Sequence, residues 1–136
     1  MQSPSRTRTV AATLAVNYHG TKAVCDALLD KMADGGRICN IASASGPMYV
    51  SALGDADERA LLTAKVPAID ELDALALKYA GMTDYENSAY GLSKALVNAY
   101  TRALAAAHPR LTIVSVTPGF LATDLTKGMG ATKPPS

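Results

Sequence analysis

Apolar residues recur at helical spacing near the start of the chain, between residues 11 and 32. The residues that carry this pattern are Leu14, Val24, Ala27, Leu28 and Met32. The run Asp34-Gly35-Gly36 ends it, because glycine takes the backbone conformation that terminates many helices. The spacing therefore predicts one long helix over residues 11–32.

Two short runs of β-forming residues and a second helical pattern come later in the chain. The short runs, 37–42 and 111–116, predict strands. The pattern over 88–107 predicts a long helix that Asn87 or Ser88 would cap. Helices and strands that alternate in this order are typical of a parallel sheet, so the predicted fold class is α/β. Strands of such sheets are buried on both faces, and we expect the same of 37–42.

The segment 47–86, between the first strand and the second long helix, is charged and rich in alanine. Helical patterns at 56–65 and 70–80 are separated by Pro67, which cannot continue a helix. The segment predicts a helical insertion.

The two ends of the chain lie outside the domain predicted for residues 11–126. Residues 1–10 are mostly polar and predict a flexible arm, and residues 127–136 show no periodicity and predict a flexible tail.

Composition excludes several classes of function. The chain has 136 residues, 49% of them hydrophobic, which fits one domain at most. With 13 basic and 12 acidic residues, a net charge of +1 gives no basis for binding nucleic acid or an anionic membrane. No apolar run approaches the roughly 20 residues of a membrane span. Cys25 and Cys39 are expected to be free thiols that behave as small apolar residues. A reducing cytoplasmic compartment is therefore expected. His19 and His108 lack ligand-spaced companions, so no metal site is predicted.

Tyr90 and Lys94 are the strongest chemical signal in the chain. A helix of 3.6 residues per turn places both side chains on one face. A cation beside a phenol favours the ionised form and lowers the phenol pKa from about 10, toward proton exchange with a substrate near neutral pH. The pattern Tyr-x-x-x-Lys is common by itself and gains weight from the predicted strands on either side of it.

Three stretches, in this order, resemble the short-chain dehydrogenase/reductase family and within it the carbonyl reductases of the monomeric type. They are LAVNYHGT at 14–21, GRICNIAS at 36–43, and SAYGLSK at 88–94 followed by TPGFLATD at 117–124. The resemblance extends from about residue 11 to 132. It implies a doubly wound, Rossmann-type sheet of which this chain holds the C-terminal half. The family's first half, whose glycine-rich turn binds the cofactor pyrophosphate, has no counterpart before Asn17.

The resemblance implies four catalytic residues. Tyr90 would be the general acid in carbonyl reduction, and Lys94 would tune it and bond the nicotinamide ribose. Ser43, at the strand edge where open α/β sheets place ligands, would polarise the substrate carbonyl. Asn17, unfavourable inside a helix, would hold a water in a proton relay at a local kink.

The resemblance also implies the cofactor contacts and the partners. Tyr90, Lys94, Pro118 and Gly119 would lie at the nicotinamide, and Thr123 would contact its carboxamide. NADPH is the expected cofactor and a small carbonyl compound the expected substrate, and a complete protein of this type would be a monomer. An alternative stays open, in which the chain is an inactive fragment or an interaction module that self-associates through an exposed sheet edge.

Overall fold

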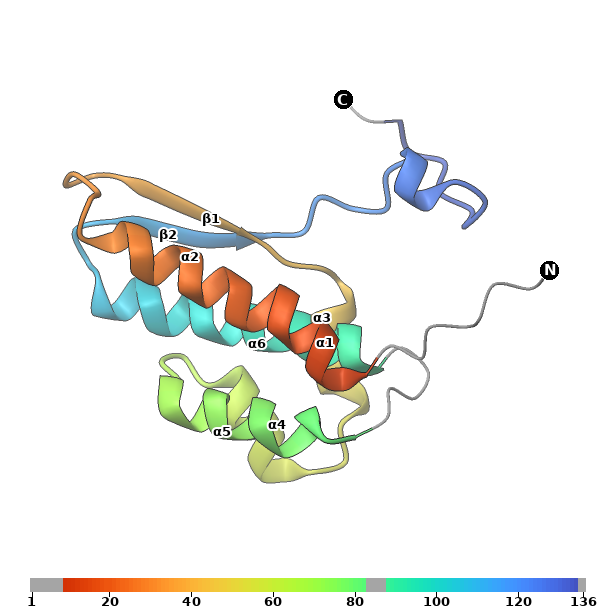
Figure 1. Cartoon of the computed structure of the whole chain (residues 1–136), viewed down its shortest axis with the longest axis horizontal. Coiled ribbons are helices and arrows are strands. Elements are labelled where there is room, and N and C mark those ends of the chain that lie inside the picture. The colour runs from red at the N-terminus through yellow and green to blue at the C-terminus, as the bar shows by residue number, and fades with distance from the viewer. Residues whose placement is uncertain (1–8, 83–87, 135–136) are drawn as a thin grey trace.

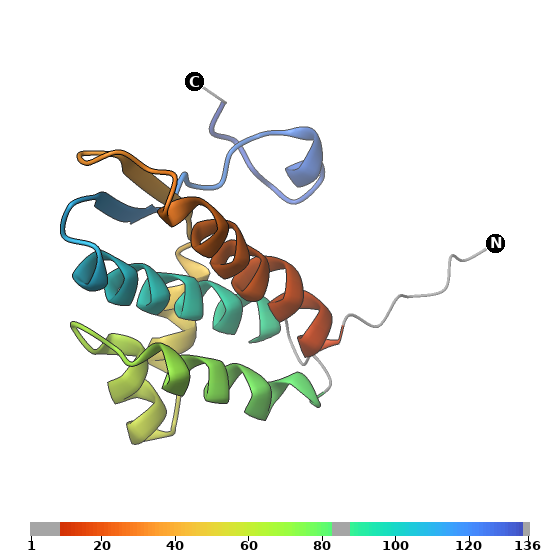
Figure 2. The same cartoon turned by 60° about the vertical axis from the view of Figure 1, so that its left-hand side comes forward.

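Helices pack against one face of a two-stranded sheet in the computed structural model, which describes residues 9–82 and 88–134 (Figure 1). The elements in chain order are α1 (Val10–Leu14), the π-turn η1 (Ala15–His19), α2 (Gly20–Leu29), β1 (Arg37–Ile41), α3 (Ser45–Ala52), α4 (Ala56–Thr63), α5 (Ile69–Ala80), α6 (Ser88–Ala107), β2 (Thr112–Val116) and the short 3-10 helix η2 (Asp124–Thr126). Figures 1 and 2 show the sheet, then α2 and α6, then α5.

The two strands are adjacent and parallel, as predicted. Their register runs from Arg37 opposite Thr112 to Ile41 opposite Val116. Alternate residues point toward the helices, where Asn40 and Ile113 are buried. The outward side chains are exposed, among them Ile41 at 57% and Val114 at 45%. The prediction of a buried strand is therefore wrong, and Cys39 is exposed for the same reason.

α6 is the central helix: it packs against α1, η1, α3, α4, α5 and both strands, and its Tyr100 hydroxyl bonds Asp26 of α2. The prediction of a helix over 88–107 is confirmed, with Ser88 as its first residue. Asn87, the other predicted cap, lies outside the described residues. The buried residues of α6 are Ala89, Gly91, Leu92, Ser93, Ala95, Leu96, Val97, Ala99, Tyr100, Thr101, Ala103 and Leu104. A buried surface on so many sides makes this helix the core of the domain.

The first predicted helix is present but interrupted. It begins at Val10, widens into the π-turn at 15–19 and ends at Leu29, ahead of Gly35, whose φ of 78° requires glycine. Val24 and Leu28, which carry the apolar pattern in the sequence, are exposed. The helix is confirmed, and its buried face differs from the one that an unbroken helix would present.

The insertion contains the two predicted helices and one more. α4 and α5 match the patterns at 56–65 and 70–80, and Asp55 caps α4 by accepting from the Asp57 and Glu58 amides, both at 3.0 Å. The carboxylate of Glu58 then bonds Lys78 at 2.5 Å and Tyr79 at 2.8 Å, which joins α4 to α5. The sequence missed α3, which carries Pro47 in its first turn, where proline is tolerated.

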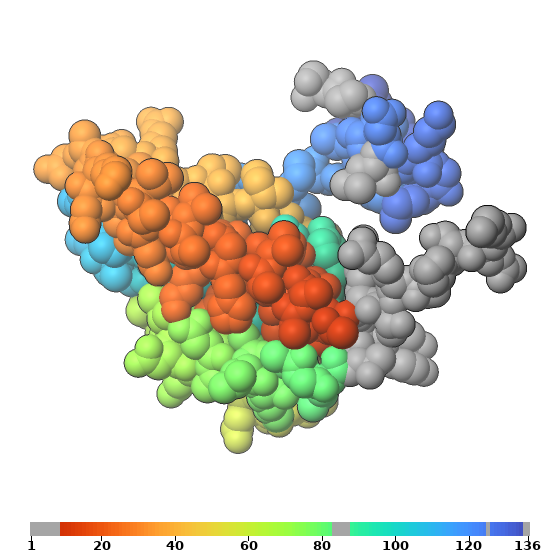
Figure 3. Space-filling model, viewed as in Figure 1, coloured from red at the N-terminus to blue at the C-terminus, as the bar shows by residue number. Residues whose placement is uncertain are grey.

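Near both ends of the chain, the described residues form local structure. Residues 1–8 lie outside the described residues, but Val10 is helical and buried. Near the C-terminus, Leu121 pairs with Lys133 in an isolated bridge, and the Ala122 amide donates to the Lys133 carbonyl at 2.7 Å. The segment 121–133 therefore closes on itself, and Figure 3 shows it standing off the helices. Within 9–82 and 88–134, every helix is too short or too polar to span a lipid bilayer.

Candidate functional site

Tyr90 and Lys94 lie on one face of the first turns of α6. The Lys94 ammonium is 5.7 Å from the centroid of the Tyr90 ring, within the range of a cation–π contact. Tyr90 is 42% exposed, so a small molecule can reach its phenol. The side-chain arrangement that the four-residue spacing predicts is present.

Lys94 also joins α6 to the sheet. Its Nζ donates to the carbonyl of Ile41, the last residue of β1, at 2.8 Å. An ammonium has three donors, so this bond engages one of them. The ammonium is thereby held at the carboxyl end of a parallel strand, the end at which open α/β sheets bind their ligands.

Asn17 occupies the middle of the π-turn, which agrees with the kink that the family resemblance implies there. Its Nδ2 donates to Ser93 Oγ at 3.0 Å, and Ser93 Oγ donates to the Tyr90 carbonyl at 2.7 Å. The Asn17 carbonyl itself accepts from Thr21 Oγ1 at 2.8 Å. A continuous set of hydrogen bonds therefore connects the π-turn with the helix turn that carries Tyr90.

Ser43 follows β1 and precedes α3. Its Oγ accepts from the Ser45 amide at 3.2 Å and donates to Ser45 Oγ at 3.3 Å. α3 packs closely on α6 through two glycines. A Cβ on Gly46 would lie 3.0 Å from the Lys94 carbonyl carbon, and one on Gly91 would lie 3.2 Å from the Ser45 carbonyl oxygen. This close packing holds the chain after Ser43 against the turn of α6 that carries the tyrosine and the lysine.

The three predicted nicotinamide contacts after β2 fall into two places. Pro118 and Gly119 leave β2 at its carboxyl end, the same end of the sheet that Lys94 marks on β1, because the strands are parallel. Gly119 has a φ of 92°, which favours glycine. Thr123 lies in the 121–133 segment, where it caps η2 together with Thr126. Figures 1 and 2 show this segment apart from the helices, so the structure does not bring Thr123 to the other residues.

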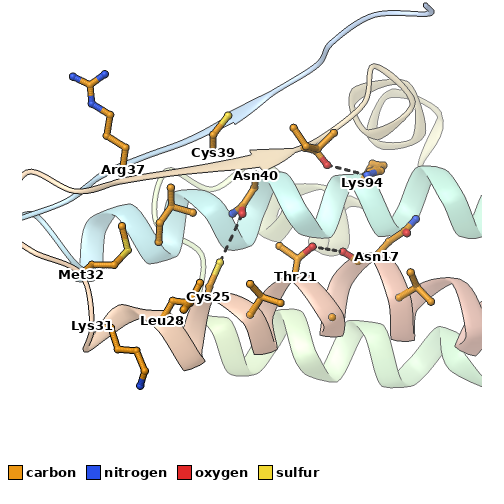
Figure 4. Close-up of a pocket in the computed structure, with 15 residues that line it drawn as sticks. Asn17, Thr21, Cys25, Leu28, Lys31, Met32, Arg37, Cys39, Asn40 and Lys94 are labelled. Carbon is orange, nitrogen blue, oxygen red and sulfur yellow. Dashed lines mark hydrogen bonds between the residues drawn. The ribbon is translucent and has the colours of Figure 1, made fainter. Parts of the chain in front are cut away.

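A groove of about 790 Å³ runs between α2 and β1, and Asn17 and Lys94 line one end of it (Figure 4). Lys31 and Arg37 line the other end, and apolar side chains such as Val24 lie between. None of the described residues that line the groove is acidic. The groove is therefore apolar along its length and basic at both ends.

Two other tyrosines near the site have a different environment. Tyr18 is fully buried and donates to Asp73 at 2.8 Å, and burial, followed by that bond, raises the pKa of its phenol. Burial likewise raises the pKa of Tyr100, whose hydroxyl bonds Asp26 at 3.3 Å. Both phenols stay protonated and enclosed, so of these three tyrosines Tyr90 is the one that a substrate can reach.

The sequence reasoning missed two hydroxyl groups on the buried face of α6. One is Ser93, which bonds Asn17, and the other is Thr101, which accepts from Asn40 Nδ2 at 2.9 Å. Asn40 also accepts from the Cys25 thiol at 3.7 Å. Both could have been found in the sequence, because each is a hydroxyl residue at a position that the apolar pattern of the helix assigns to the core. A polar group there requires a hydrogen-bond partner.

No family model matches the chain. Salutaridine reductase from Papaver bracteatum is 35% identical over 130 residues, which cover 86% of this chain and 41% of that protein. Carbonyl reductase 3 (NADPH) from Mus musculus is 30% identical, with 88% of this chain and 48% of that protein covered. The structure of salutaridine reductase from Papaver somniferum superposes with a TM-score of 0.72 at 25% identity, covering 89% of this chain and 46% of that one.

The chain is homologous to part of a short-chain dehydrogenase/reductase domain. It spans less than half the length of these relatives, and (+)-neomenthol dehydrogenase from Arabidopsis thaliana gives the same proportion, 42%, at 32% identity. The parallel pair β1 and β2 is accordingly a portion of the doubly wound sheet of a short-chain dehydrogenase/reductase. The relatives are reductases and dehydrogenases, so the family to which the chain is related is one of oxidoreductases.

Proposed function

We propose that this chain supplies the catalytic half of an NADPH-dependent carbonyl reductase, which converts an aldehyde or ketone into an alcohol. The observation that carries the proposal is the hydrogen-bonded set at the carboxyl end of β1. In this set, Ser93 joins Asn17 to the helix turn that carries Tyr90. A separate bond from Lys94 to the Ile41 carbonyl joins α6 to β1. Both cysteines are free, which supports the reducing cytoplasm as its compartment.

The four candidate catalytic residues each have a task in that reaction. A bound nicotinamide would supply the hydride for the carbonyl carbon. Tyr90 donates its phenolic proton to the carbonyl oxygen, and Ser43 donates a hydrogen bond to the same oxygen. Lys94 favours the phenolate that remains, and Asn17 takes part in returning a proton to it.

The residues present fit one end of the cofactor. Lys94 has donors for a ribose, and Pro118 and Gly119 turn the backbone at the sheet edge where a nicotinamide would lie. The described residues do not include a glycine-rich turn between a strand and a helix, which is the structure that binds the pyrophosphate. NADPH is favoured over NADH because carbonyl reductase 3 of Mus musculus, one of the relatives, carries NADPH in its name.

A chimaera tests the proposal. The N-terminal part of carbonyl reductase 3 from Mus musculus is joined to residues 9–134 of this chain, and NADPH oxidation is followed with aldehydes and ketones. We expect turnover in the chimaera and a loss of at least about 100-fold in Tyr90→Phe, because the variant deletes the transferable proton. The control Tyr79→Phe also removes a phenolic hydroxyl, but one that bonds Glu58 outside the site. Its turnover should stay within about twofold of the parent.

The proposal fails if Tyr90→Phe keeps more than about a tenth of the parent turnover, because general acid catalysis contributes more than that. Cofactor binding by Tyr90→Phe, measured by calorimetry, should be nearly unchanged. A parallel loss of binding would show that the Tyr90 hydroxyl also holds the cofactor, provided that Tyr79→Phe, an ordinary tyrosine substitution, leaves binding unchanged.

A second candidate function is self-association, and the exposed side of the sheet favours it. β1 has a neighbour on one edge only within the described residues, and Ile41 on its outer face is 57% exposed. We propose that a second copy pairs with this edge. A two-fold axis makes such a pair of β1 strands antiparallel, which keeps the basic ends at Arg37 apart.

Sedimentation equilibrium tests the self-association. Ile41→Lys places a charge on the outer face of the edge strand β1 and should weaken the dimer by at least about tenfold. Leu77→Lys adds the same charge at a position that is 76% exposed on α5, away from the edge, and should leave the dimer unchanged. A monomeric wild-type chain at all concentrations, or equal effects of the two variants, would contradict the proposal.

A further inference from the structure

α6 holds two asparagines of neighbouring elements with two hydroxyl groups on its buried side. Ser93 Oγ accepts from Asn17 Nδ2 at 3.0 Å and donates to the Tyr90 carbonyl at 2.7 Å. Thr101 Oγ1 accepts from Asn40 Nδ2 at 2.9 Å and donates to a carbonyl of its own helix at 2.7 Å. We call these sets the Ser93 bridge and the Thr101 bridge. The first connects α6 with the π-turn, and the second connects α6 with β1.

The hydroxyl group of each bridge is buried, whereas Asn17, the partner of Ser93, is half-buried and lines the groove. Ser93 is 0% exposed and Thr101 is 3% exposed. A hydroxyl supplies one donor, and in each bridge that donor bonds the helix while the oxygen accepts the asparagine amide. At the two hydroxyl groups, water cannot replace a lost bond without entering the core. Each bridge therefore fixes the position of an asparagine relative to the backbone of α6.

The two bridges differ in what lies beside them. Ser93 is flanked by the Tyr90 turn and by Lys94, and the asparagine that it holds belongs to the π-turn. Thr101 lies about 12 Å farther along α6, at the helical rise of 1.5 Å per residue. The Ser93 bridge is therefore the one that links the candidate proton donor to the candidate relay residue.

We propose that Ser93 is a positioning residue, which couples the π-turn at Asn17 to the Tyr90–Lys94 pair. Its hydroxyl holds the Asn17 carboxamide and the Tyr90 carbonyl in one arrangement, so that a proton returned by way of Asn17 reaches the tyrosine at a fixed distance. The catalytic consequence rests on the proposed function, whereas the structural coupling does not.

Hydrogen exchange followed by NMR on the full chain tests the coupling. In Ser93→Ala, exchange of the Asn17 side-chain amide and of the backbone amides at 15–21 should quicken by at least about tenfold, with Asn40 unchanged. The matched control Thr101→Val should show the opposite, with faster exchange at Asn40 and an unchanged π-turn. Equal effects of both variants on both regions, or an unchanged π-turn in Ser93→Ala, would overturn the proposal.

If Ser93→Ala does not fold, Ser93→Cys serves in its place, because a thiol is a similar but larger group with weak hydrogen bonds. It should show the same local pattern with smaller amplitude. A thiol variant with wild-type exchange at both Asn17 and the π-turn amides would overturn the proposal as well.

The chimaera described above tests the catalytic consequence. Ser93→Ala should lower kcat by about tenfold, keep KM for the carbonyl within about twofold, and shift the pH profile of kcat. Thr101→Val should leave that profile unchanged. An unshifted profile in Ser93→Ala contradicts the positioning role. An inactive parent chimaera contradicts the proposed function alone, and the exchange experiment then decides the coupling.

Discussion

The ammonium of Lys94 donates a 2.8 Å hydrogen bond to the carbonyl of Ile41, across 53 positions of sequence. The same ammonium lies 5.7 Å from the centre of the Tyr90 ring. One side chain thus touches the end of β1 and the phenol of α6. This relationship makes the lysine a structural link as well as a candidate catalytic group.

Lys94→Met should therefore damage more than one property. In the reductase chimaera, we expect turnover and NADPH affinity each to fall by at least about tenfold, because the variant removes a charge beside the phenol and a donor for the ribose. Steady-state kinetics and calorimetry measure the two. A variant that loses turnover at unchanged affinity would show that Lys94 does not bind the cofactor.

The isolated chain should bind NADPH weakly. The backbone donors that hold a pyrophosphate at a helix N-terminus are not among its described residues, so only contacts at the nicotinamide end contribute. Calorimetric titration should give a dissociation constant well above about 1 μM. Binding at micromolar strength or tighter would show that this chain contains a pyrophosphate site of its own.

Gly91→Ala should destabilise the chain by about 1–3 kcal/mol, because it overpacks the contact between α3 and α6. The added Cβ would lie 2.9 Å from the Tyr49 Cβ and 3.2 Å from the Ser45 carbonyl oxygen. Gly81→Ala is the matched control. Its Cβ meets nothing within 4 Å, and it should change stability by less than about 0.5 kcal/mol in urea denaturation.

Acid should destabilise the fold partly through Asp73. Burial works to raise the pKa of its carboxyl, but hydrogen bonds from Lys22 and Tyr18 outweigh burial and hold the pKa below its ordinary value. Such a group stabilises the fold above its unfolded-state pKa of about 3.9 and ceases to do so as pH falls through the lower folded-state value.

Urea midpoints measured from about pH 6 down to pH 3 check this. Asp73→Asn should lower the midpoint at the upper end of that range and flatten its fall at the lower end. Tyr18→Phe, which removes one of the two donors, should give an intermediate slope. A wild-type slope in Asp73→Asn would assign the acid sensitivity to other groups.

The sequence predicted those elements whose pattern is long or local. The helix at 88–107 and both strands are present because apolar periodicity and β-branched runs report directly on local structure. The spacing of Tyr90 and Lys94 likewise placed both on one face. α3 was missed because Pro47 reads as a helix breaker, although the first turn of a helix accepts proline.

Features that depend on distant parts of the fold could not be read in this way. The exposure of Cys39 depends on how many layers cover the sheet, which no local pattern records. The partners of Ser93 and Thr101 come from the π-turn and from β1, far away in sequence. The contacts of Ser93 therefore emerged from packing alone. The predicted site roles all stay predictions, those of Asn17, Ser43, Tyr90, Lys94, Pro118, Gly119 and Thr123.

The π-turn also sets the phase of the helix that follows it. Each residue turns an α-helix by about 100°, so Val10 and Leu29 would point about 100° apart in an unbroken helix. Both are buried on the same side, because the π-turn takes up one extra residue between them.

That single residue decides which of two adjacent pairs on α2 enters the core. Cys25 and Leu29 are buried, while Val24 and Leu28 face the groove. If residues 15–19 wound as an ordinary α-helix with no residue lost, α2 would be rotated by about 100°, which would bring the second pair toward the core in place of the first. The π-turn at Asn17 thus sets the rotation of α2, which keeps the apolar side chains of Val24 and Leu28 on the side of the groove.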